Sequence, residues 1–273
     1  MDLRTGSVVV VTGAASGIGA ALARAFSAAG CAVVLADVEA AALEQVASSL
    51  DGPVHTVITD VCHAAAVERL ADAAFDRFGA VHVLCNNAGV STFNPLSAQG
   101  LDDWRWVLGV NLWGVVHGVH TFLPRLLAQG QPAHIVNTSS LAGIVSGLPE
   151  LGPYNVSKVG VVAISETLRI ELAMAGAPIA VSVLCPGSTE TRILESERNR
   201  PPALGQETRL PEGEAFREAV RAGFRSSGAR TPDQVAAQVL EAVRAGDFWI
   251  VTSGEMNDLV RNRGREIEAS LPK

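Results

Sequence analysis

The sequence contains a single tyrosine, Tyr154, and one lysine away from its terminus, Lys158, four positions further along. A spacing of four places two side chains on one face of a helix. A free phenol has a pKa of about 10, too high for a base at neutral pH. A cation at about 5 Å, with an effective dielectric near 20, would stabilise the phenolate by roughly 3 kcal/mol, about 2.4 pKa units. The pair therefore predicts a general acid or base that moves a hydroxyl proton.

Two further polar side chains extend this cluster. Ser140 ends a β-branched run, so its hydroxyl can donate to a substrate oxygen shared with Tyr154; the alternative is an ordinary turn serine. Asn111 interrupts an apolar helical stretch, where it can kink the helix, hold a water behind Lys158 or serve structure alone. The predicted catalytic residues are therefore Asn111, Ser140, Tyr154 and Lys158.

A glycine-rich turn lies near the start of the chain. Gly13, Gly17 and Gly19 follow a β-branched run and open a helix, where the backbone can approach a pyrophosphate. Asp37 ends the next such run, where a carboxylate binds adenosine ribose hydroxyls and repels a 2′-phosphate. The alternatives are a tight turn for the glycines and a helix N-cap for Asp37. Because positions 14–16, 38 and 40 hold neither Arg nor Lys, the sequence predicts NAD rather than NADP. The positive nicotinamide ring would lower the pKa of Tyr154 further.

Other strand ends offer further cofactor contacts. Asp60 and Val61 either hold the adenine edge or form a turn, and Asn86 with Asn87 chiefly stabilises the pocket floor. The stretch 185–191 supplies hydroxyl and backbone groups for the nicotinamide carboxamide. The predicted cofactor-binding residues are Gly13, Ser16, Gly17, Ile18, Gly19, Asp37, Asp60, Val61, Asn87, Ala88, Gly89, Tyr154, Lys158, Pro186, Gly187, Thr189 and Thr191.

Short β-branched runs alternate with longer helical segments, which predicts an α/β fold with a doubly wound parallel sheet of about seven strands. The predicted strands are 7–12, 32–36, 54–58, 81–85, 134–137, 179–184 and 248–251. The predicted helices are 17–29, 39–50, 64–78, 101–127, 154–174 and 232–245.

The whole chain, 1–273, is predicted to form one domain, because no linker or repeat interrupts this alternation. Residues 188–230 break the pattern with a polar stretch after a strand end, and this insertion is interpreted as a substrate lid with short helices near 191–199 and 214–224. The alternative is a surface loop without function. Residues 252–273 form a C-terminal extension.

Composition limits the partners. A net charge of −7 disfavours nucleic acid and anionic membrane surfaces, and no apolar run approaches the roughly 20 residues that span a bilayer. Four dispersed cysteines and the absence of a signal peptide indicate reduced thiols and a cytoplasmic protein. The histidines lack the neighbours of a metal site, so none is predicted.

Taken together, TGAASGIG at 12–19, NNAG at 86–89, Asn111, Ser140 and YNVSK at 154–158 resemble the short-chain dehydrogenase/reductase family over residues 5 to 251. The resemblance implies a Rossmann-like fold, Tyr154 as proton donor or acceptor, and Lys158 bonding the nicotinamide ribose. It also implies substrate positioning by Ser140, a proton relay through Asn111, and binding of the carboxamide and pyrophosphate by Thr189 and Thr191. Ser140 lies 14 residues before Tyr154, where 13 is common in the family, so Ser139 is an alternative to it. Tetramers are common, dimers are possible, and helices 101–127 and 154–174 would form the interfaces.

The expected reaction is hydride transfer between NAD and a secondary alcohol or ketone. The insertion and the tail are similar to bacterial members that act on bulky aryl, alicyclic, terpenoid or steroid-like alcohols. Two alternatives stay open: a reductase of carrier-linked 3-ketoacyl groups, and a non-catalytic regulator that senses a dinucleotide. The candidate pocket walls, mostly apolar, are Ser91, Phe93, Val145, Leu148, Leu151, Ile193, Leu194 and Phe224.

Overall fold

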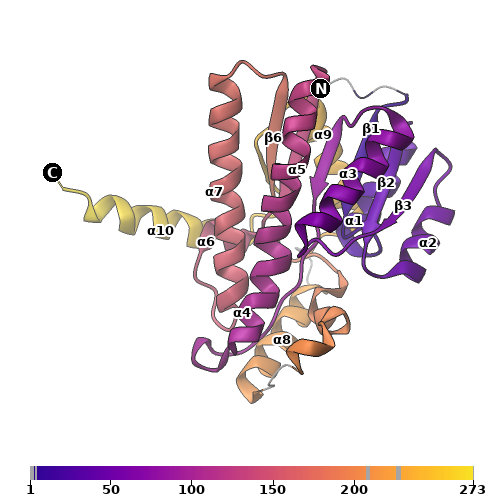
Figure 1. Cartoon of the computed structure of the whole chain (residues 1–273). Coiled ribbons are helices and arrows are strands. Elements are labelled where there is room, and N and C mark those ends of the chain that lie inside the picture. Colours follow the sequence, from indigo (N-terminus) through magenta and orange to yellow (C-terminus); the bar gives the residue numbers. More distant parts are fainter. Residues whose placement is uncertain (1–2, 4, 207–209, 226–228, 273) are drawn as a thin grey trace.

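Seven parallel strands form one sheet in the order β3-β2-β1-β4-β5-β6-β7 (Figure 1). The computed structural model describes residues 3, 5–206, 210–225 and 229–272. The strands are Val8–Thr12 (β1), Ala32–Asp37 (β2), Val54–Ile58 (β3), Val83–Asn86 (β4), Ala133–Thr138 (β5), Ile179–Cys185 (β6) and Trp249–Val251 (β7). All seven predicted strands are confirmed, with ends that move by at most two residues. The strand order reverses between β1 and β4, and ligands bind beyond the carboxyl ends of strands at such a point.

Helices cover both faces of the sheet because the strands are apolar on both sides. The helices are α1 (Gly17–Ala28), α2 (Ala40–Ser48), α3 (Ala64–Phe78), α5 (Gly114–Gln129), α7 (Gly152–Met174) and α9 (Pro232–Ala245). Val8 and Val10 of β1 pack into a core with α3, α5 and α7, whereas Val9 and Val11 pack into a second core with α1 and α9. This arrangement confirms the predicted doubly wound, Rossmann-like α/β fold.

The predicted helix 101–127 has a more complex structure. It begins as α4 (Leu101–Leu108), widens into a π-helical turn at η2 (Gly109–Trp113) and continues as α5. A Cβ at Gly114 would lie only 2.8 Å from Cγ2 of Val61, so the helix crosses this neighbour very closely. By length and composition alone, the composite helix could span a membrane, but the core helix of a soluble protein meets the same criteria. In its most apolar stretch, 44% of the residues are buried inside the fold.

The described residues of the insertion, 188–206, 210–225 and 229–230, form a layer beyond the carboxyl ends of the strands (Figure 1). Its described elements are η3 (Arg192–Asn199), η4 (Pro202–Leu204) and α8 (Pro211–Gly223). The two short helices predicted here are confirmed, the first as 3-10 turns; residues 207–209 and 226–228 lie outside the described residues. A buried ion pair of 2.7 Å between Arg200 and Asp103 fastens the insertion to α4.

Besides η4 in the insertion, the described residues contain three helices that are absent from the sequence prediction. Leu96–Ala98 (η1) and Leu141–Val145 (α6) are too short to show a helical period. Asn257–Ser270 (α10) is polar, contains Gly264 and buries no residue in the fold, so it lacks the apolar stripe of a packed helix. Figure 1 shows α10 projecting away from the rest of the chain.

Candidate active site

One cavity of about 540 Å³ lies at the carboxyl ends of the strands. All the residues predicted to bind the cofactor line this cavity, and so does Ser140. Among the predicted catalytic residues, Asn111 is absent from its walls. The topology therefore brings side chains from β1 to the end of β6 to a single edge of the sheet, as the parallel arrangement requires.

The glycine turn leaves room for a phosphate group. Gly13 has φ +68°, and a Cβ there would lie 2.8 Å from Cα of Ala88. A Cβ at Gly19 would lie 2.0 Å from the Gly13 carbonyl oxygen, so neither position tolerates a side chain. Across the described residues, no side chain caps the N-terminus of α1 at Ser16. The first residues of α1, Gly17 to Gly19, line the cavity, and the N-terminus of a helix favours a pyrophosphate at such a place.

Asp37 stands at the end of β2 in the same cavity. Its Oδ2 accepts a hydrogen bond of 3.0 Å from the Ala15 N–H, and its Oδ1 accepts one of 3.0 Å from the Glu39 N–H. These contacts fix a carboxylate beside the glycine turn, where it can bind ribose hydroxyls. The residues therefore fit NAD.

Asp60 and Asn87 have structural contacts as well as positions in the cavity wall. Asp60 Oδ1 accepts the Cys62 N–H at 2.9 Å, so Asp60 does form a turn. Asn87 donates from Nδ2 to the Thr12 carbonyl at 2.9 Å and ties β4 to β1. Each residue thus positions the cavity wall through a local or cross-strand hydrogen bond.

Tyr154 and Lys158 lie on the first turns of α7, which begins with Gly152 and Pro153. Pro is suited to this position because its φ is already helical and its missing N–H would have had no helical partner. Lys158 Nζ lies 5.4 Å from the centre of the Tyr154 ring and donates to the Thr138 carbonyl at 2.9 Å. The predicted common face is confirmed by this geometry.

Burial dominates the protonation of this pair. It raises the pKa of Tyr154, and the hydrogen bond between the Tyr154 and Ser140 hydroxyls opposes that rise only in part. It also lowers the pKa of Lys158 to about 8. Desolvation therefore sets the direction of the Tyr154 pKa in the chain without cofactor, and the lowering expected from Lys158 together with the positive nicotinamide ring stays a prediction for the NAD-bound protein.

The two neighbouring serines face different partners. Ser139 donates to the Lys158 carbonyl at 2.7 Å and is almost fully buried. Ser140 caps α6 by accepting the Ala142 N–H at 3.1 Å, and its hydroxyl meets Tyr154. Of the two, Ser140 is the one placed to share a substrate oxygen with Tyr154.

Asn111 acts from behind the cavity. Its amide accepts from the Val90 N–H at 2.8 Å and donates to the Val90 carbonyl at 2.9 Å and to Ser157 Oγ at 3.1 Å. It joins the π-helical turn, the loop after β4 and α7 while remaining fully buried. These three bonds use both hydrogens of the Asn111 amide and one of the two lone pairs of its oxygen, so the side chain chiefly ties these segments together.

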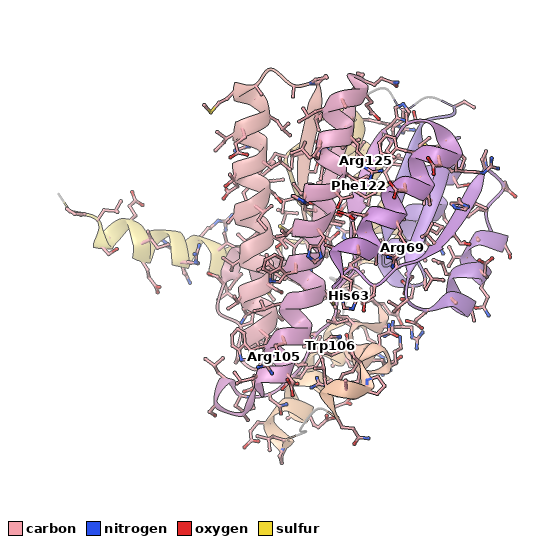
Figure 2. All side chains as sticks on the ribbon, in the orientation of Figure 1. His63, Arg69, Arg105, Trp106, Phe122 and Arg125 are labelled. Carbon is pink, nitrogen blue, oxygen red and sulfur yellow. The ribbon has the colours of Figure 1, made fainter. Side chains whose placement is uncertain are left out.

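The far side of the cavity is mostly apolar. The predicted walls line it except Val145, which ends α6 outside it. Sequence reasoning missed several wall residues because they come from distant elements: Val90, Trp106, Phe216, Val220, Glu255 and Met256. Trp106 lies on α4 (Figure 2). The Arg200 guanidinium lies over its ring, 5.4 Å from the ring centre. Glu255, from the C-terminal extension, accepts the Ser188 N–H at 2.7 Å.

Comparison with known proteins agrees with this site. The short chain dehydrogenase family model matches residues 7–202. The chain is 43% identical to 1-deoxy-11-beta-hydroxypentalenate dehydrogenase of Streptomyces avermitilis, over 97% of this chain and 96% of that protein. It is 40% identical to C alpha-dehydrogenase of Sphingobium sp., over 72% of this chain and 65% of that protein.

A solved structure matches the entire fold. The short-chain dehydrogenase/reductase from Burkholderia phymatum, crystallised in complex with NAD, superposes with a TM-score of 0.95 at 41% identity, over 100% of this chain and 98% of that one. The family match, the cavity and the hydroxyl chemistry at Tyr154 agree with one another. This chain belongs to the short-chain dehydrogenase/reductase family and is an NAD-dependent oxidoreductase acting on CH–OH groups.

Proposed function

We propose that the protein interconverts a bulky, apolar secondary alcohol and its ketone, with Tyr154 as the general acid and base. The observation that carries this proposal is the convergence of an apolar wall on the Tyr154 and Ser140 hydroxyls inside one cavity. When bound, NAD supplies the ring that accepts or returns a hydride.

In the oxidation direction, the chain's own residues manage the proton. Ser140 donates a hydrogen bond to the substrate oxygen and orients it, and Tyr154 removes the hydroxyl proton. Lys158 stabilises the phenolate that must precede this step, from 5.4 Å away. In the reduction direction, the phenol of Tyr154 returns the proton to the forming alkoxide.

The substrate class follows from the wall. Phe93, Leu151 and Leu194 form a cluster of buried apolar residues, and Phe216 with Phe224 packs against it from the insertion. A carbon skeleton of several rings or a substituted aryl group would bury its surface here. A relative named for a hydroxypentalenate and a relative named C alpha-dehydrogenase support the same class.

The test is a panel of secondary alcohols with NAD, followed by absorbance of NADH, with the matching ketones and NADH in parallel. Aryl and polycyclic alcohols should react with higher kcat/KM than short aliphatic ones. A carrier-linked 3-ketoacyl substrate belongs in the same panel, and faster turnover of it would favour that alternative. NADH binding without turnover of any member would favour a non-catalytic sensor.

We further propose that the insertion closes over the substrate as a lid and that the enzyme is a cytoplasmic homotetramer. Large apolar side chains on the outer faces of η2, α5 and α7 support the tetramer, with Trp113 54%, Ile170 54% and Met174 84% exposed. These helices are the ones that the family resemblance assigns to interfaces. Sedimentation analysis would show the assembly, and a monomer at micromolar concentration would contradict it.

A further inference from the structure

Two arginines of the insertion lie at the adenosine end of the cavity, where the local sequence offers no cation. Arg192 and Arg198 line the same cavity as Asp37 and Val38. Arg198 is 159 positions from Glu39 in the chain, so no motif near the glycine turn reveals this approach. The fold therefore places positive charge next to the residue that selects the ribose.

Glu39 holds both arginines. Its Oε1 accepts hydrogen bonds from Arg198 Nε at 2.9 Å and from Asn199 Nδ2 at 2.8 Å, and Arg198 Nη2 lies 2.8 Å from the same oxygen. Its Oε2 lies 3.5 Å from Arg192 Nη1. Although burial alone would raise the pKa of Glu39, the hydrogen bonds from Asn199 and Arg198 and the two guanidinium charges hold that pKa below its ordinary value. Glu39 is thus an anion at neutral pH that pairs with both guanidinium groups, and Arg192 Nε also lies 3.2 Å from Oε2 of Glu195.

The Arg198 guanidinium has a second anchor. Nη1 donates to the Arg192 carbonyl at 3.0 Å and to the Glu195 carbonyl at 2.9 Å. Removing Glu39 would free Nε and Nη2 but leave Nη1 fixed to the backbone of η3. The freed donors would then face the cavity beside Asp37, whose carboxylate already contacts the Glu39 N–H.

We propose that Glu39 is a second determinant of the preference for NAD, acting with Asp37, because it keeps Arg198 and Arg192 in ion pairs that withhold them from a 2′-phosphate. Asp37 repels that phosphate directly, whereas Glu39 removes the cations that would attract it. An arginine near this position is what accommodates the 2′-phosphate of NADP in related folds. Replacing Asp37 alone should therefore remove repulsion without creating a phosphate site.

The experiment measures equilibrium binding by calorimetry for Asp37→Ser, Glu39→Ala and the double variant. The probes are NADH and NADPH, together with ADP and adenosine 2′,5′-bisphosphate as adenosine fragments. Asp37→Ser should raise the affinity for NADPH modestly, and the double variant should raise it by about a further tenfold or more. In the double variant, the affinity for adenosine 2′,5′-bisphosphate relative to ADP should rise by the same factor. Added salt should reduce this rise.

Two further sets of variants locate the source of the gain. Adding both Arg192→Met and Arg198→Met to the double variant should abolish its gain in affinity for NADPH. Glu44→Ala removes the same charge from α2, where the Glu44 carboxylate accepts the Thr56 hydroxyl at 2.7 Å, and should leave the preference unchanged. Glu39→Gln keeps the shape of the side chain and provides the test if the alanine variant folds poorly; its gain should be smaller.

The proposal is overturned if the double variant binds NADPH no better than Asp37→Ser does. It is also overturned if the gain survives removal of both arginines, since the phosphate would then be bound elsewhere. Because binding of the fragments needs no substrate, the result is independent of the proposed alcohol.

Discussion

The cofactor side and the substrate side of the cavity are built in different ways. The cofactor side consists of short turns at the ends of β1, β2 and β4, held by backbone contacts such as that between Gly19 and Gly13. The substrate side collects side chains from α4, the insertion and the C-terminal extension, including Trp106, Phe216 and Met256. The first is fixed by the sheet, whereas the second depends on elements that pack over it.

The two sides differ in how many of their residues can be substituted without disturbing the fold. Turns between buried strands tolerate few substitutions, because a Cβ at Gly13 or Gly19 meets backbone atoms. The insertion contacts the rest of the chain through separate ion pairs and apolar clusters, so its side chains can vary one at a time. Glu39 belongs to both sides, since it lies after β2 and binds the insertion.

The largest effect is expected at the point where the two sides meet. Tyr154→Phe removes the phenol that moves the proton, and the chain has no other tyrosine to replace it. We expect kcat to fall by about 10³-fold, with NADH binding retained because the glycine turn and Asp37 are untouched. Steady-state kinetics and calorimetry measure the two quantities. Turnover near that of the parent protein would contradict the assigned role.

The same tyrosine allows a direct titration. In the absence of NAD, burial raises the pKa of Tyr154, so its ultraviolet difference spectrum should show ionisation only above the range of a free phenol. Ionisation at neutral pH without cofactor would show that Lys158 outweighs desolvation after all.

The next largest effect concerns the stability with which the insertion, part of the substrate side, is held to α4. Arg200 and Asp103 form an ion pair of 2.7 Å with 6% and 5% of their side chains exposed. Arg200→Met should cost about 3 kcal/mol, because it leaves the Asp103 carboxylate buried without its cation. Proteolysis should then cut the insertion first, while NADH still binds. Unfolding in denaturant measures the free energy of unfolding. The double variant Arg200→Met/Asp103→Leu should recover part of the stability that Arg200→Met loses.

A buried histidine in the sheet is expected to make the stability of the protein depend on pH. His134 on β5 is fully buried, its Nε2 lies 2.7 Å from Ser182 Oγ, and burial lowers its pKa to about 4. Between pH 6.5 and 4 the unfolded chain binds a proton that the folded protein does not, so stability is lost as pH falls through this window, by up to about 3 kcal/mol.

His134→Asn should flatten this acid dependence, measured as the free energy of unfolding against pH. His120→Asn, at an exposed position on α5, is the matched control and should keep the parent slope. An unchanged slope in His134→Asn would assign the acid sensitivity to other groups.

Every residue that the sequence assigns to the cofactor lines the cavity, whereas the sequence named only part of the apolar wall. Gly13, Asp37 and Tyr154 belong to local patterns whose spacing has a physical reason, and the parallel sheet brings their ends together. Trp106 and Glu255 carry no such pattern, since they reach the cavity only through long-range packing. In the chain without cofactor, burial raises the pKa of Tyr154, and burial cannot be read from a spacing of four residues.

The smallest effect concerns the apolar wall. Phe224 follows α8, packs on the cluster of Phe93, Leu151 and Leu194, and lines the cavity. Phe224→Ala should raise KM for a bulky apolar alcohol by about tenfold, since a partly buried ring contributes roughly 1.5 kcal/mol of apolar contact. NADH affinity should not change, because the cofactor side lacks this residue. Phe78→Ala, a similar truncation on α3 away from the cavity, should leave both values unchanged, and equal losses in the two variants would show a general loss of stability.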